Sequence, residues 1–164
     1  MRVTGAGVAG DVRRCLLLFG TMLETADVRK RLMHRLGELR KASGQRRALA
    51  DAARAAFESV MDREIAPTVR QFAQALKAEG LAFSVQTPSA SVRLVSDRSS
   101  DNAIEIALDL TGRQPTVYAR SSYTRGRRDL QDERVLAEGE AIGALDAERV
   151  LAALLDLVEP FVER

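Results

Sequence analysis

The spacing of apolar residues changes near residue 80. Before this point they recur at intervals of three and four, as in the stripe that begins with Val28 and Leu32. After it they alternate with polar residues, most strictly over 103–110. The first spacing places side chains on one face of a helix, and alternation places them on one face of a strand. Residues 1–80 are therefore predicted to be helical, and 81–140 to form five short strands.

Local signals divide the helical part into segments. A helix is predicted to begin around Thr25 to Asp27 and to end at Ser43-Gly44, because glycine commonly follows the last turn of a helix. The next helix is expected to start near Gln45. Pro67 either kinks this helix or lies in the first turn of a further one, and Gly80 suits its C-terminal end.

The alternation of apolar and polar residues indicates an antiparallel sheet with one buried face and one solvent-exposed (wet) face. If consecutive strands pair as a meander, Arg93 and Arg120 lie opposite the wet-face carboxylates Glu105 and Asp109. Such cross-strand pairs contribute only about 0.2–1 kcal/mol each, which favours a structural role.

The strands run together in sequence and the helices are segregated from them, so the fold class is α+β. We expect an N-terminal helical arm or hairpin, a five-stranded antiparallel sheet and a C-terminal helix, capped by Asp146, packed on one sheet face. Residues 1–25 are predicted to be a Gly-rich N-terminus and short helix, 26–80 the helical arm, and 81–164 the sheet with its closing helix. The last two are expected to form one folded unit.

Cysteine content and hydropathy bear on the compartment. Cys15 is the only cysteine, so an intrachain disulfide is impossible, as is usual in a reducing cytoplasm. The apolar run 16–19 is too short for a transmembrane segment. These features predict a soluble cytoplasmic protein.

Charge is distributed unevenly between the two parts. Residues 1–80 carry a net charge of +6 and 81–164 a net charge of −4, which gives +2 for the chain. Residues 29–47 alone carry eight cations against Glu38, a net +7. The candidate binding residues of this stretch are Arg29, Arg31, Arg35, Arg40, Arg46 and Arg47. A basic amphipathic helix of this kind is typical of a solvated face, a phosphate-binding surface or a surface for an acidic partner.

A second basic cluster is predicted in a polar loop at 124–132. Its candidate residues are Arg125, Arg127 and Arg128. Nearby carboxylates such as Asp129 and Asp132 partly cancel its charge, which favours a solvated loop over a binding one.

Catalytic signatures are missing from the pattern. His34 is the only histidine, and a pairing with Cys15 has no local motif to support it. The stretch 5–10 matches a glycine-rich nucleotide-binding motif in letters, but the preceding strand and the following strand with its acidic residue are absent. No cluster of residues has metal-ligand spacing. We therefore expect no catalytic residues, no metal and no cofactor, and we favour a protein that is not an enzyme.

These observations favour a non-catalytic interaction or assembly module, such as an accessory subunit of a larger complex. The apolar surface of two amphipathic helices and one sheet face exceeds what a single layer covers, so the sequence predicts a homodimer through the helices. Its basic helical face would meet a protein partner with an acidic surface. The alternative is a nucleic-acid-binding protein whose helix 29–47 and loop 125–128 contact phosphates.

Overall fold

The computed structural model describes residues 24–88 and 90–162. The predictions for the Gly-rich N-terminus, the short helix before residue 20 and Cys15 lie outside these residues. The chain divides into two compact units, residues 1–43 and 44–164. The α+β class and its three parts, a long N-terminal helix, a five-stranded antiparallel sheet and a C-terminal helix, are as predicted.

Helix α1 runs without interruption from Thr25 to Val60. The predicted end at Ser43-Gly44 is therefore wrong. Gly44 keeps a negative φ, since the described glycines with positive φ are Gly80, Gly126 and Gly139. A glycine in helical conformation lowers helix stability by about 1 kcal/mol relative to alanine. This cost is too small to end a helix of 36 residues.

A π-helical turn, η2 (Met61–Ile65), separates α1 from α2 (Ala66–Ala78). The buried residues Val60 and Ile65 are five positions apart. Neighbouring side chains on one face of an α-helix are three or four positions apart, and the wider π-helical turn brings residues five apart onto the same face. Pro67 lies in the first turn of α2, where its missing N–H costs nothing. Gly80, with a φ of 82°, follows the helix end as predicted.

The five strands form one antiparallel sheet in the order β1-β2-β3-β4-β5. Their bounds are β1 Phe83–Gln86, β2 Ser91–Ser96, β3 Ser99–Asp109, β4 Thr116–Arg125 and β5 Arg128–Glu138. The register is regular except at two places, one of them between Val117 and Tyr118 of β4. There β5 has an extra residue, Leu136, so that Leu136 and Ala137 are both buried.

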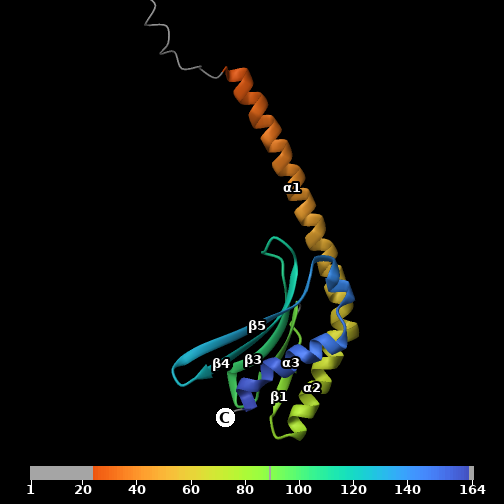
Figure 1. Cartoon of the computed structure of the whole chain (residues 1–164), viewed down its shortest axis with the longest axis vertical. Coiled ribbons are helices and arrows are strands. Elements are labelled where there is room, and N and C mark those ends of the chain that lie inside the picture. Colours follow the sequence, from red (N-terminus) through yellow and green to blue (C-terminus); the bar gives the residue numbers. More distant parts are fainter. Residues whose placement is uncertain (1–23, 89, 163–164) are drawn as a thin grey trace, which may run out of the picture. The chain divides into compact units, whose positions relative to one another are not determined.

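A short 3₁₀ turn, η3 (Gly139–Ala144), leads to α3 (Ala147–Val162). Asp146 caps α3 as predicted, because its Oδ1 accepts a hydrogen bond of 2.9 Å from the N–H of Arg149. Helix α2 contacts β1 and β2, and α3 contacts α2 and strands β3 to β5 (Figure 1). The aliphatic core lies between these helices and one face of the sheet, with Ile104, Ile106 and Leu154 each 1% exposed.

Candidate interaction surfaces

The basic residues predicted for the helical stretch all lie on α1, and all are exposed: Arg29, Arg31, Arg35, Arg40, Arg46 and Arg47. Those up to residue 40 belong to the first unit, and Arg46 and Arg47 belong to the second. Glu38 lies 3.8 Å from His34 across one turn, with both side chains largely exposed. The cations of this stretch are thus arrayed along a helix surface, with one carboxylate among them.

Large apolar side chains accompany these cations within the first unit. Five of them are exposed: Val28 (46%), Leu32 (55%), Met33 (61%), Leu36 (37%) and Leu39 (47%). The three leucines recur at spacings of four and three, so they form one stripe along the helix. Val28 lies on the same stripe and Met33 borders it, and we call these five residues together the apolar stripe of α1. Contiguous exposed apolar side chains with polar flanks mark an interaction surface more often than a solvated one.

Arg125, Arg127 and Arg128 lie at the tip of a tight hairpin, and the long loop predicted at 124–132 is wrong. Arg125 pairs with Arg128 in the register of β4 and β5, and Gly126 adopts a φ of 67° in the two-residue turn between them. The three arginines are exposed and lie together. Sequence reasoning predicted only residues 134–138 as the last strand and missed the first half of β5, because both of its faces are polar near the tip.

A row of charged side chains crosses the sheet on the face opposite the core. The register places Arg93 beside Glu105, Glu105 beside Arg120, and Arg120 beside Glu133. Arg93 and Arg120 were predicted opposite Glu105 and Asp109, and both lie opposite Glu105. Asp109 lies instead opposite Thr116.

Contacts within this row are uneven. Arg120 donates from Nε and Nη2 to Glu133 Oε2, at 2.9 Å and 2.6 Å. Glu105 Oε1 accepts a hydrogen bond of 2.9 Å from Ser91 Oγ. Among the described residues, Arg93 Nε is buried and has no acceptor.

The side chains of Tyr118 and Arg120 are in contact and affect each other's pKa. The guanidinium carbon of Arg120 lies 4.7 Å from the centre of the Tyr118 ring, in cation–π contact. Burial raises the pKa of Tyr118, while the positive charge of Arg120 opposes this shift. The hydrogen bond to Glu133 raises the pKa of Arg120, which therefore stays charged. Both pKa values thus move away from neutral pH, so neither group is an acid or base poised for catalysis there.

Asp109 is held ionised by the turn that follows β3. Its Oδ1 accepts hydrogen bonds from the N–H of Thr111 at 2.8 Å and from Thr111 Oγ1 at 2.7 Å. These bonds lower the pKa of Asp109, the side-chain bond most strongly. A lowered folded-state pKa adds stability above the ordinary pKa, and this contribution disappears as the pH falls through the folded value.

We expect Thr111→Val to raise the pKa of Asp109 toward its ordinary value, because the stronger of the two hydrogen bonds is removed. A carboxyl NMR titration of the two proteins measures the change. Thr25→Val, in the other unit, should leave the titration of Asp109 unchanged. An unchanged pKa in Thr111→Val would show that the backbone bond alone determines it.

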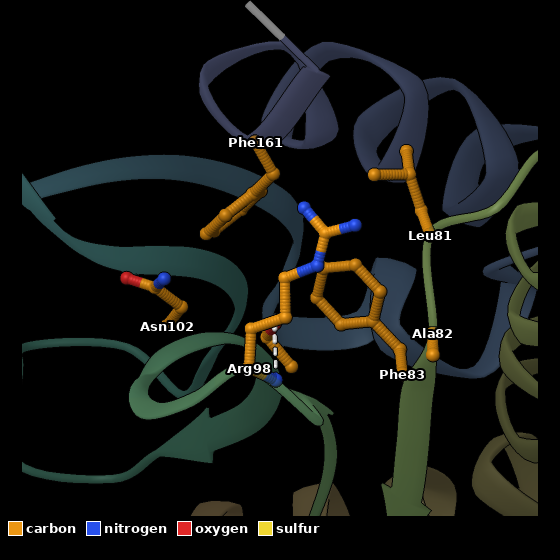
Figure 2. A pocket seen from close by; sticks show the side chains of 7 residues that line it. Leu81, Ala82, Phe83, Arg98, Asn102 and Phe161 are labelled. Atoms are coloured by element: carbon orange, nitrogen blue, oxygen red, sulfur yellow. Dashed lines mark hydrogen bonds between the residues drawn. The ribbon is translucent and has the colours of Figure 1, made fainter. Parts of the chain in front are cut away.

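The cavities of the second unit are small or shallow. One of about 40 Å³ lies among residues that include Phe83, Asn102 and Phe161, with Arg98 at its rim (Figure 2). The Phe161 ring packs edge-on against Phe83 and Tyr123, with centroids 5.7 Å and 5.8 Å away. This volume accommodates ordered water but no substrate. A wider depression of about 390 Å³ lies beside η2 and the β1–β2 loop, lined partly by Glu58, Asp62 and Arg70.

Within 24–88 and 90–162, no three His, Cys, Asp or Glu side chains are grouped so as to hold a metal ion. None of the helices in the described part of the chain is long and apolar enough to cross a membrane. Comparison with protein-family models, curated proteins and solved structures finds no match to this chain.

Proposed function

We propose that this chain is a protein-interaction module whose α1 segment 28–41 binds an acidic amphipathic helix of a partner protein. The observation that supports this function is the apolar stripe of α1 with its flanking cations. Its five large apolar side chains are 37% to 61% exposed. Fully burying an exposed side chain of this size is worth about 1.5–3 kcal/mol, so burying the exposed half of each would contribute roughly 1 kcal/mol per residue and favours a helix-on-helix contact.

Charge identifies the kind of partner. Segment 28–41 contains six cations and one anion, a net +5. In the heptad that places Leu32 and Leu39 at d and Leu36 at a, Arg35 falls at g and Arg40 at e. Residues at e and g flank a helix–helix seam and select its partner by charge. Glutamates at these positions of the partner would pair with Arg35 and Arg40.

The dipole of the helix also favours an acidic partner. Arg29, Lys30 and Arg31 lie in the first two turns of α1, where positive charge opposes the helix dipole. A neighbouring acidic helix would neutralise this charge and stabilise these turns. The predicted homodimer through the helices remains a prediction, and a parallel pairing of two copies sets Arg35 against Arg40 of the other copy.

Binding of a designed probe tests this proposal. The probe is a labelled three-heptad peptide with leucine at a and d and glutamate at e and g, and its matched form carries lysine at e and g. Fluorescence anisotropy should show binding of the glutamate peptide and about tenfold weaker binding to Arg35→Glu/Arg40→Glu, because both flanking pairs become repulsive. The lysine peptide should prefer this variant over the native protein.

The matched control is Lys30→Glu/Lys41→Glu, which changes the net charge equally at heptad positions b and f, away from the seam. It should weaken binding of the glutamate peptide far less than Arg35→Glu/Arg40→Glu does. Failure of the glutamate peptide to bind overturns the proposal. Tight, salt-sensitive binding of duplex DNA or RNA that both variants weaken equally would instead establish the nucleic-acid alternative, because phosphate binding depends on total charge.

A further inference from the structure

The sheet has a second face, opposite the one that packs against the helices. Over β2 to β5, alternate residues form it in three rows, the middle one being the charged row Arg93, Glu105, Arg120 and Glu133. Strand β1 extends two of the rows at the edge of the sheet with Ser84 and Gln86. None of these residues packs in the main core cluster between sheet and helices. Four of the twelve on β2 to β5 are nevertheless buried, at 3% to 9% exposure: Ser91, Val95, Ala103 and Ala107. We call these rows the open face.

The charged row alternates in sign across the four strands, in the order positive, negative, positive, negative. Read in the opposite direction, from β5 to β2, the signs are negative, positive, negative, positive. If a second copy of the row is laid over the first in this opposite direction, each charge therefore faces a charge of the other sign. A two-fold axis that runs parallel to the strands between β3 and β4 performs this reversal when two open faces meet.

Of the two neighbouring rows, one is graded in size in the same sense. It consists of Ser91, Ala107, Tyr118 and Val135, with two small residues followed by two large ones. The same two-fold axis sets Tyr118 against Ala107, and Val135 against Ser91. In the third row, Val95, Ala103, Ser122 and Gln131, it sets Gln131 against Val95 and Ser122 against Ala103. The charges of the middle row thus become complementary under this operation. The third row pairs residues of similar size, and one member of each pair in the two outer rows is 9% exposed or less, so the complementarity comes from the charged row.

We propose that the open face binds the open face of a second copy of this chain, related by this two-fold axis. Glu105 then meets Arg120 of the other copy, and Arg93 meets Glu133 of the other copy. A face-to-face pair of sheets is a common packing in proteins, and an isologous contact closes as a dimer. This surface is distinct from the segment 28–41 of the proposed function, so either one can fail without the other.

The area of the open face indicates a weak dimer. Four strands about 4.8 Å apart and three rows about 6.8 Å apart cover roughly 400 Å² per copy. Stable interfaces bury about 800 Å² per partner. We therefore expect dissociation in the micromolar range, measurable by sedimentation velocity over a concentration series.

Two charge reversals test the proposal. Glu105→Arg places an arginine against Arg120 of the other copy, and Arg120→Glu places a glutamate against Glu105 of the other copy. Each variant alone should raise the dimer Kd by at least about tenfold. An equimolar mixture of the two should form a heterodimer with native-like affinity, because the repulsive pairs are absent when the two variants meet.

This recovery separates the interface from effects on folding, since a misfolded variant cannot be rescued by another. Circular dichroism of each variant verifies that the fold is retained. Leu36→Lys, on the apolar stripe of α1, serves as the control and should leave this dimer unchanged. A native protein that stays monomeric through the concentration series, or variants whose mixture stays monomeric, would overturn the proposal. So would a dimer that Leu36→Lys abolishes and Glu105→Arg leaves intact.

Discussion

Replacing Leu154 with alanine is expected to lower the free energy of unfolding by about 2–5 kcal/mol. Leu154 is 1% exposed on α3, in the core between the helices and the sheet. Truncation removes buried methyl groups and leaves a cavity that rigid neighbours fill only partly. Urea unfolding followed by far-UV circular dichroism measures the change.

The next residue of α3 provides the control. Leu155 is 56% exposed, so Leu155→Ala removes an equal number of atoms with little loss of burial and should change the free energy of unfolding by less than about 1 kcal/mol. Equal losses in the two variants would mean that α3 does not pack on the sheet through the face that contains Leu154.

Substituting Ser121 with alanine should stabilise the protein by about 1–2 kcal/mol. Ser121 of β4 is 0% exposed, and its Oγ has no hydrogen-bond partner among the described residues. A buried hydroxyl without a partner costs free energy that the unfolded chain, whose hydroxyl is solvated, does not carry. Alanine removes this cost while filling most of the same space.

Ser122→Ala is the matched control for this prediction. Ser122 adjoins Ser121 but lies on the open face, only partly buried, so its hydroxyl can remain hydrated. We expect a change in the free energy of unfolding of less than about 0.5 kcal/mol. A destabilised Ser121→Ala would indicate that ordered water or an unseen acceptor satisfies the hydroxyl in the folded protein.

Local signals predicted much of the fold because they act independently of tertiary contacts. The meander follows from strict alternation in β3 together with short polar connections. The cap at Asp146 and the left-handed Gly80 follow from the chemistry of helix ends. These elements require only neighbours in the sequence.

The wrong predictions arose where a local signal competed with a longer-range effect. Ser43-Gly44 resembles a helix end, yet α1 continues through it because a single glycine costs too little to break a long helix. The strand pairing near Arg125 and Arg128 was missed because β5 is exposed on both sides there and therefore does not alternate. Only its pairing with β4 identifies it as a strand.

The candidate surfaces could be predicted from sequence only in part. The basic residues of α1 are evident from composition, but their exposure together with the apolar stripe is a structural fact. The alignment of Arg93, Glu105 and Arg120 follows from a meander once its register is known. The register near β5 depends on the bulge at Leu136, which no pattern in the sequence signals.

The π-helical turn Met61–Ile65 has a consequence for how the chain tolerates insertions and deletions. Its extra residue brings Val69, Phe72 and Leu76 of α2 into phase with Phe57 and Val60 of α1, so that both helices bury their apolar sides in one core. An α-helix turns by about 100° per residue, so losing one residue here would rotate the apolar side of α2 away from β1 and β2. The length of segment 61–65 therefore determines which side of α2 faces the sheet, so insertions and deletions should be tolerated poorly there.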